Sequence, residues 1–275
     1  MIPRIAYGRT GLTVSRLCFG TGQLMAGRFG VSTEEGAELM RHAWSLGVSF
    51  FDTAIGYDTH RHVGLALRSL PRPEVVVNTK TGAATAAEAR ASVEQSLHEL
   101  GVDYIDIMML HGIRSDEDFR RREAALDELV KAKNEGLLRA VGASTHVFTG
   151  GAMRACIGDP RIEVILTLVN RTGVGLRGDY REHLALVAEA YRTGKAVAGM
   201  KILGEGYMAD SAEDELRHAF TFPDIHAVDL GMASRAQVEM AALIAGGEDV
   251  PSALRAAARL GAKGEWGERF PDAYH

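Results

Sequence analysis

The stretch "VVVNTKTGAATAAEARASVEQSLHELGVDYIDIMMLH", residues 75–111, decides the fold. Its two apolar runs, "VVVNTK" and "YIDIMMLH", are continuous rather than alternating, which is typical of strands buried on both faces of a parallel sheet. Between them, Thr85 can begin a helix and Gly101 can end it. One apolar stripe runs along that segment, formed by Val93, Leu97 and Leu100. The stretch therefore predicts a strand–helix–strand unit.

The same alternation extends over the rest of the chain. Helix-period segments separate eight apolar runs, and the first such segment can begin at Ser32 or Thr33. The runs cover residues 17–20, 48–52, 75–80, 104–111, 138–144, 164–170, 195–201 and 226–232. The predicted helices cover residues 32–47, 85–101, 117–136, 179–194, 211–220 and 235–247. Eight alternations predict an α/β fold of the (β/α)8 TIM barrel type, with residues 1–275 as a single domain.

An open doubly wound sheet is the rival fold, but no G-x-G-x-x-G follows the first strand. Residues 2–16 do not fit a strand–helix unit, and "GRTG" within them predicts a β-hairpin that caps the barrel bottom. Residues 266–275 are expected to be irregular. The segments "GGAM" and "AGGE" are interpreted as turns, and the charge run "RRRE" at 120–123 as a solvated helix face.

Bulk composition narrows the class of protein. Of the 275 residues, 46% are hydrophobic and 24% charged, with a net charge of −5. An acidic balance gives no support for nucleic-acid binding. No apolar run reaches 18 residues and the beginning of the chain lacks an apolar signal core, so no membrane association is expected. The two cysteines suggest neither a disulfide framework nor a zinc site, and a cytoplasmic location is expected.

Four titratable residues lie at or just after predicted strand ends. Asp52 ends the second run, Lys80 the third and His111 the fourth, while Tyr57 lies in the loop after Asp52. A carboxylate after buried aromatic residues is costly unless it has a partner. Active sites of barrels lie where strands end and loops begin. We therefore expect these four side chains to meet at one rim.

Their chemistry is complementary. An Asp beside a Lys keeps that Lys charged, and a Lys⁺ beside a Tyr hydroxyl lowers the pKa of the Tyr. A nearby His can orient or polarise a carbonyl oxygen. His60 and His62 form a His-x-His pair that can mark a metal-dependent barrel hydrolase. Because no further ligands stand at the other strand ends, no metal site is expected.

Several of these motifs resemble the aldo-keto reductase superfamily. "FFDTAIGYDTHRHVGLAL" is similar to that family's Asp-Thr-Ala…Tyr-Gly…Gly-x-Ala-Leu signature. "VVVNTKTG" resembles its Lys strand, "YIDIMMLHGI" its His strand and "VGAST" its Gly-x-Ser-Asn segment. "GRTGLTVSRLCFGTGQL" is similar to its hairpin and first strand, and "MKILGEG" and "GMASRAQVE" resemble its cofactor-phosphate region. The resemblance covers nearly the whole chain in order.

The resemblance implies a reduction of carbonyl compounds by NAD(P)H. In it, Tyr57 is the general acid that protonates the carbonyl oxygen, Lys80 lowers its pKa, Asp52 holds Lys80, and His111 orients the carbonyl. Aldehydes, ketones or sugars are the expected small-molecule partners. The alternative that the resemblance leaves open is a weakly catalytic, cofactor-binding regulatory or interaction subunit.

The resemblance also implies a set of cofactor contacts. They are Gly20, Thr21, Ser144, Thr145, Asn170, Met200, Lys201, Leu203, Gly231, Ser234 and Arg235. Thr145 and Leu166 stand where an Asn and a Gln usually contact the carboxamide. Arg235 is the nearby residue expected to meet a 2′-phosphate, and Lys201 is expected to contact the cofactor phosphate rather than pair with Glu205. NADP is therefore the expected cofactor, with NAD as the alternative.

Overall fold

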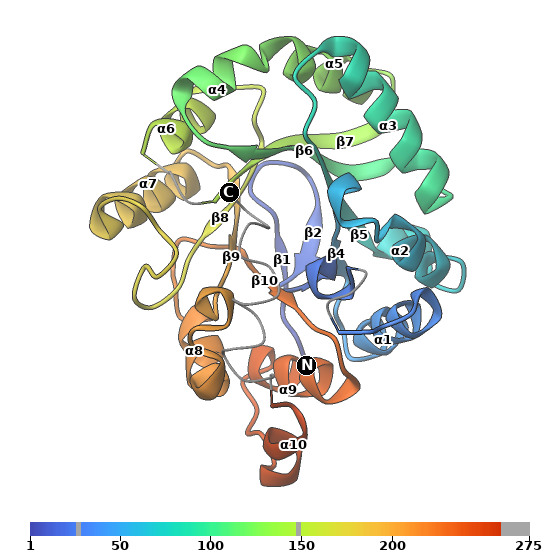
Figure 1. Cartoon of the computed structure of the whole chain (residues 1–275), viewed down its shortest axis with the longest axis vertical. Helices are drawn as coiled ribbons and strands as arrows, with labels where there is room; N and C mark the ends of the chain where they lie inside the picture. Colours follow the sequence, from blue (N-terminus) through green and yellow to red (C-terminus); the bar gives the residue numbers. More distant parts are fainter. Residues whose placement is uncertain (26–28, 147–149, 260–275) are drawn as a thin grey trace.

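A closed barrel of eight parallel strands forms the centre of the molecule (Figure 1). The computed structural model describes residues 1–25, 29–146 and 150–259. Around the barrel the strand order is β10-β3-β4-β5-β6-β7-β8-β9. Their bounds are β3 Leu17–Gly20, β4 Phe50–Asp52, β5 Val76–Thr81, β6 Ile105–Ile113, β7 Leu138–Thr145, β8 Val164–Leu168, β9 Ala196–Met200 and β10 Ala227–Gly231. Each strand falls on one of the eight predicted runs, which confirms the barrel.

Helices surround the barrel, as Figure 1 shows. They are α1 Thr33–Ser45, α2 His60–Leu67, α3 Ala86–Leu100, α4 Asp116–Arg121, α5 Glu123–Asn134, α6 Gly150–Gly158, α7 Tyr180–Arg192, α8 Ala212–Ala219, α9 Arg235–Ala245 and α10 Ser252–Ala257. Ser32 and Thr85 cap α1 and α3 through capping boxes with Glu35 and Glu88. Each box satisfies backbone N–H groups that a helix start leaves without partners.

Two helical predictions are wrong. The segment at 117–136 is not one helix, because it breaks at Arg122 into α4 and α5. The residues "GGAM" are not a turn but begin α6, where Ala152 and Met153 are fully buried. Burial of that apolar face outweighs the low helix propensity of the two glycines. The irregular structure expected for residues 266–275 lies outside the described residues.

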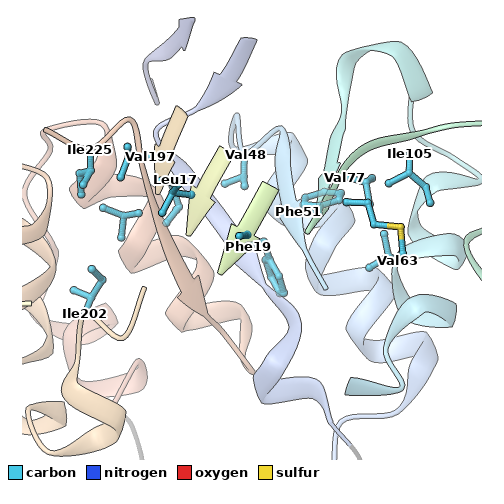
Figure 2. Close-up of a cluster of buried hydrophobic side chains, with 14 of the residues drawn as sticks. Leu17, Phe19, Val48, Phe51, Val63, Val77, Ile105, Val197, Ile202 and Ile225 are labelled. Atoms are coloured by element: carbon cyan, nitrogen blue, oxygen red, sulfur yellow. The ribbon is translucent and has the colours of Figure 1, made fainter. Parts of the chain in front are cut away.

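Side chains of the barrel strands alternate between two apolar clusters. The larger cluster lies between strands and helices and includes Leu17, Phe19 and Phe51 (Figure 2). The smaller cluster fills the barrel interior. Its strand residues include Cys18, Phe50, Val76, Ile107, Met109, Ala140, Val164, Leu166, Ala198 and Ala227. Strands buried on both faces explain the continuous apolar runs in the sequence.

The predicted hairpin is confirmed as β1 (Arg4–Ala6) paired antiparallel with β2 (Thr13–Ser15). Tyr7, fully buried, packs its ring 5.4 Å from that of Phe50 in the inner cluster. The backbone of Gly8 comes so close to Ala196 that an added Cβ would lie 2.4 Å from the Ala196 nitrogen. The hairpin therefore closes one end of the barrel and leaves the opposite, carboxyl end for a site. Within the described ranges, the helices are all too short or too polar to span a membrane.

Candidate active site

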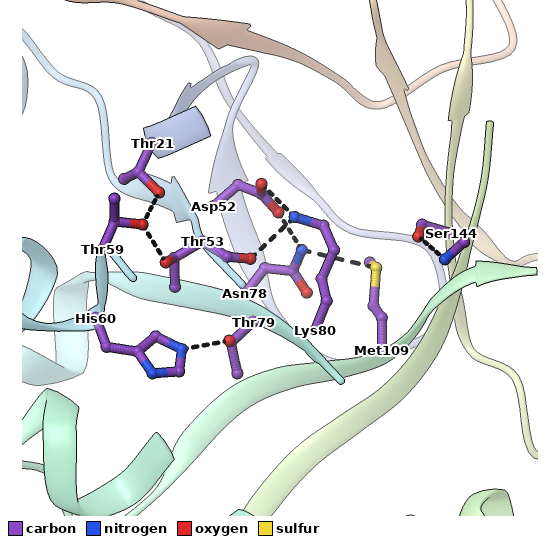
Figure 3. A network of polar contacts seen from close by, with 11 residues as sticks. Thr21, Asp52, Thr53, Thr59, His60, Asn78, Thr79, Lys80, Met109 and Ser144 are labelled. Atoms are coloured by element: carbon purple, nitrogen blue, oxygen red, sulfur yellow. Dashed lines mark hydrogen bonds and ion pairs between the residues drawn. The ribbon is translucent and has the colours of Figure 1, made fainter. Parts of the chain in front are cut away.

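Asp52 and Lys80 form a buried ion pair at the carboxyl ends of β4 and β5 (Figure 3). Lys80, 1% exposed, donates to Asp52 Oδ2 at 2.5 Å and to the Thr53 carbonyl at 2.9 Å. The Asn78 amide donates to the other oxygen of Asp52. Burial alone would lower the pKa of Lys80, but the charge of Asp52, aided by Tyr57 and Asp229, raises it. The carboxylate therefore holds this lysine in its charged form.

Tyr57 lies beside this pair, at the end of a single 3-10 turn, Ile55–Tyr57, that follows β4. The Lys80 ammonium is 4.9 Å from the centroid of its ring. The next residue, Asp58, has a left-handed backbone with φ of 56°. That conformation favours Gly, and Asp and Asn tolerate it better than most other residues. The turn thus holds the tyrosine half-buried over the lysine.

His111 completes the group from β6. Its ring lies 5.6 Å from that of Tyr57 in an edge-to-face arrangement. The pairing of β6 with β7 shifts register between Leu110 and Ile113, and Gly112 adopts a positive φ of 67° there. Burial, followed by the charges of Lys80 and Arg122, lowers the pKa of His111 to about 3. The imidazole is therefore neutral near pH 7 and can donate one hydrogen bond.

Arg122, which sequence reasoning placed on a solvated helix face, is buried instead. Its guanidinium donates to three carbonyl oxygens, those of Thr81 at 3.0 Å, Ala83 at 3.0 Å and His111 at 2.9 Å. It is 6% exposed. These bonds tie the end of β5 to the end of β6, and so tie Lys80 to His111. The sequence did not indicate this role, because a run of three arginines is typical of a solvated face and only Arg122 points inward.

Asp229 on β10 is a second carboxylate that sequence reasoning missed. It pairs in register with Cys18, and its Oδ1 would lie 2.6 Å from a Cβ added to Gly20. That oxygen is buried and accepts no hydrogen bond. Burial, followed by the charge of Asp52, raises the pKa of Asp229. The signal was present in "AVDLGM", where an acid interrupts an apolar strand in the same way that Asp52 ends one.

Two neighbouring residues predicted to contact the cofactor, Ser144 and Thr145, differ in whether their hydroxyl groups are already engaged. Ser144 Oγ accepts from the Gly112 nitrogen at 2.8 Å, which leaves its own proton available to donate. The Thr145 hydroxyl is instead 2.7 Å from the Thr167 hydroxyl and contacts Met153 Sδ. Thr145 is fully buried on the face toward the helices, so the structure provides no free side-chain group there.

The remaining predicted cofactor residues lie at or after the ends of β3, β8, β9 and β10. Thr21 is fully buried, and its hydroxyl is bonded to Thr59, as Figure 3 shows. Asn170 bonds the backbone of its own loop through Val174 and Gly173. Met200 ends β9 and Leu203 is partly buried. At the end of β10, an added Cβ on Gly231 would meet the Gln23 side chain at 2.5 Å.

Three of these residues lie where a phosphate was expected. Ser234 caps α9 by accepting from the Gln237 nitrogen at 3.3 Å. Arg235, with 69% of its side chain exposed, pairs with Glu239 at 3.0 Å. Lys201 pairs with Glu205, the alternative that the sequence had left as the less favoured one. The role of Lys201 as a phosphate contact stays a prediction.

His60 of the His-x-His pair has a structural explanation. His60 is buried and bridges Glu99 and Thr79, with 2.7 Å to each. Within the described ranges, no group of three or more His, Cys, Asp and Glu side chains could hold a metal ion. A network of ordinary hydrogen bonds therefore accounts for His60.

Comparisons with known proteins agree with this geometry. The model of the aldo/keto reductase family matches residues 16–237. An L-galactose dehydrogenase from Arabidopsis thaliana is 32% identical over 148 residues, which cover 50% of this chain and 46% of that protein. An NADH-specific methylglyoxal reductase from Escherichia coli is 30% identical over 167 residues, which cover 51% of each. The chain thus matches about half the length of these relatives.

A solved structure shows the same fold over almost the whole chain. The holo form of an aldo-keto reductase from Bacillus halodurans superimposes with a TM-score of 0.75. The match covers 94% of this chain and 95% of that one, at 19% identity. At that identity the likeness establishes the fold alone.

Proposed function

This chain belongs to the aldo/keto reductase family, and we propose that it is an NAD(P)-dependent oxidoreductase that interconverts carbonyl compounds and alcohols. The observation that carries the proposal is the grouping of Asp52, Tyr57, Lys80 and His111 at one rim of the barrel. Asp52, Lys80 and His111 come from three successive barrel strands, and Tyr57 comes from the turn that follows the first of them.

Each of the four has a defined task in this mechanism. Tyr57 donates its hydroxyl proton to the carbonyl oxygen of the substrate. The Lys80 ammonium stabilises the tyrosinate that remains, because a positive charge beside a phenol favours its ionised form. Asp52 keeps Lys80 charged and fixes its position. His111, being neutral, donates a hydrogen bond to the same carbonyl oxygen and so fixes its orientation.

A nicotinamide cofactor, when bound, would supply the hydride. Ser144 has a proton to offer its carboxamide. We propose NADP as the cofactor, since Arg235 is exposed at the start of α9. NAD is the alternative, because Arg235 already pairs with Glu239. A paired titration with NADPH and NADH, followed by nicotinamide fluorescence, decides between them.

The decisive variant is Tyr57→Phe, which removes only the proton donor. We expect carbonyl reduction to fall by about 10²–10⁴-fold, the usual contribution of general acid catalysis. The dissociation constant for NAD(P)H should stay within about twofold of the wild type, because no cofactor contact is lost. A Tyr57→Phe protein that reduces carbonyl compounds as fast as the wild type would show that another group is the acid.

We also propose a cytoplasmic location. Cys18 and Cys156 are both buried free thiols. Free cysteines are typical of proteins in a reducing compartment.

A further inference from the structure

Three threonine hydroxyl groups form a hydrogen-bonded chain close in sequence to the turn that carries Tyr57 (Figure 3). Thr59 is the middle member, with its Oγ1 2.8 Å from that of Thr21 and 2.9 Å from that of Thr53. All three residues are fully buried. Thr21 and Thr53 directly follow the paired strands β3 and β4, and Thr59 directly precedes α2. None of the three hydroxyl groups has a task in the mechanism proposed above.

The hydroxyl group of Thr59 does not cap the helix that follows it. Thr59 is the N-cap residue of α2, where a threonine side chain typically accepts a hydrogen bond from a backbone N–H of the first turn. Among the described residues, its side chain accepts no such bond. Only its backbone carbonyl bonds that turn, accepting from the nitrogens of His62 at 3.1 Å and Val63 at 3.3 Å. The side chain instead holds the start of α2 against the ends of β3 and β4.

Through Thr53, the chain of hydroxyl groups is connected to Lys80. The Thr53 carbonyl accepts from the Lys80 ammonium at 2.9 Å, while the Thr53 hydroxyl is bonded to Thr59. Tyr57 lies two residues before Thr59, and its ring centroid is 4.9 Å from the same ammonium. The positions of the lysine and of the tyrosine are therefore both fixed relative to Thr53.

The backbone between Tyr57 and Thr59 needs such an attachment. Asp58 has a φ of 56°, a left-handed conformation that a residue other than Gly keeps only where its surroundings hold it. Before Asp58, two backbone hydrogen bonds of 3.0 and 3.2 Å close the turn. After it, the side chain of Thr59 joins the chain to the two strand ends. Loss of the Thr59 hydroxyl therefore releases one end of the turn.

We propose that Thr59 is a positioning residue, whose hydroxyl group holds the turn so that Tyr57 stays beside the Lys80 ammonium. This inference rests on the proposed function and adds a residue to it. Thr59 acts through Tyr57 and does not itself transfer the proton. Because catalysis depends on geometry to a fraction of an ångström, a loosened turn slows the reaction even though the four residues of the rim all remain.

The test is Thr59→Val, which keeps the branched shape of the side chain and removes its hydroxyl group. The probe is whichever of propanal, glyceraldehyde and benzaldehyde the wild type reduces fastest. The single-turnover rate is measured at saturating NAD(P)H, so that product release does not limit it. We expect this rate to fall about tenfold, less than the loss of about 10²-fold that a 1 Å misplacement can cause. The dissociation constant for NAD(P)H should be unchanged.

The same substitution in a second background tests whether Thr59 acts through the tyrosine. In Tyr57→Phe no acid hydroxyl is left to position, so adding Thr59→Val should slow reduction by less than about twofold. A general loosening of the site would slow reduction in both backgrounds alike. The difference between the two costs therefore separates positioning of the acid from a purely structural role.

Three further variants complete the comparison. Thr59→Ser retains the hydroxyl group and should keep most of the wild-type rate. Thr53→Val breaks the chain at its other end and should repeat the loss of rate, also where Thr59→Val does not fold. Thr79→Val removes a different fully buried hydroxyl group, which lies 2.7 Å from Nε2 of His60, the residue next to Thr59. It should lower the urea midpoint but leave the single-turnover rate unchanged, because that bond does not hold the turn.

Every other outcome contradicts the inference. A wild-type rate in folded Thr59→Val would overturn it, as would equal losses in the two backgrounds. A loss of rate in Thr79→Val as large as that in Thr59→Val would show that any weakening of the contacts of α2 slows the reaction. Weaker NAD(P)H binding with an unchanged rate would assign the hydroxyl groups to the cofactor, at Thr21. A wild-type protein that binds NAD(P)H but reduces none of the three aldehydes would overturn the proposed function and the inference with it.

Discussion

Replacing Asp52 by Asn should cost less stability than breaking a buried ion pair usually does, because a second carboxylate lies close by. Removing one partner of a buried pair typically costs about 3–5 kcal/mol, since the other charge is left uncompensated. In this protein Asp229 is near enough for its charge to act on the pKa of Lys80. The charge of Asp52 is one cause of the raised pKa of Asp229. Burial, the larger cause, remains in the variant, but without the charge of Asp52 the Lys80 ammonium favours the ionised form of Asp229, which then neutralises the lysine.

The magnitudes follow from this substitution of one counter-ion by another. Two unit charges about 4 Å apart interact by about 4 kcal/mol at an effective dielectric constant of 20. We expect Asp52→Asn to cost about 2 kcal/mol, because the attraction is largely recovered at Asp229 while the geometry is worse. Asp229→Asn should be close to neutral, since the native pair stays intact, so the two single costs together come to about 2 kcal/mol. The double variant should lose the full 3–5 kcal/mol of a broken buried pair.

Urea denaturation of the four proteins at pH 7 measures these costs as a double-mutant cycle. The expected coupling between the two substitutions is at least about 1 kcal/mol, with the double variant less stable than the sum of its parts. Costs that add to within about 0.5 kcal/mol would refute the reasoning, because independent sites add in this way. In that case Asp229 would not serve as a reserve counter-ion for Lys80.

Two further predictions concern pH and packing. The folded-state pKa of His111, about 3, lies below its unfolded value of about 6.5, so only the unfolded state takes up this proton between those values. Stability is therefore lost as the pH falls through that window. In urea titrations from pH 6 to pH 4, the unfolding free energy of the wild type should fall by about 1.4 kcal/mol per pH unit more than that of His111→Phe. Equal dependence of the two unfolding free energies on pH would contradict this. A Cβ on Gly64 would lie 2.7 Å from the Leu100 carbonyl oxygen, so Gly64→Ala should destabilise by about 1–3 kcal/mol in thermal melts. The control Gly158→Ala, which meets nothing within 4 Å, should be neutral or slightly stabilising.

The barrel could be predicted because its strands carry a strong signal. Most residues of the barrel strands are buried, on both faces of the sheet, so each strand appears as a nearly continuous apolar run. Helix α6 was missed for the opposite reason. It begins with Gly150 and Gly151, whose local preference is for turns, and only the packing of Ala152 and Met153 makes it helical. Tertiary burial of that kind is invisible to a local pattern.

Some residues of the site could likewise be predicted from the sequence, and others could not. Asp52, Lys80 and His111 could be placed together because parallel strands bring their carboxyl ends to one rim. Arg122 could not, because its three acceptors are backbone carbonyls, which every residue has. The commitment of Thr145 to Thr167 depends on the register between β7 and β8, which the sequence alone does not reveal. Residues at strand ends can thus be predicted from the sequence, whereas the partners of side chains on neighbouring strands are known only from the structure.

The hairpin of β1 and β2 has a consequence for the order in which the chain folds. Its residues are synthesised before the barrel strands, yet Arg9 bonds the Gly194 carbonyl and Tyr7 packs against His226, both of which are made much later. The barrel itself closes only when β10 pairs with β3. Contacts of such long sequence separation form late, after the entropy of a large loop has been lost. The hairpin leaves the ribosome before the barrel but is therefore among the last segments to reach its native position, and until then its apolar residues must avoid contacts with other partners.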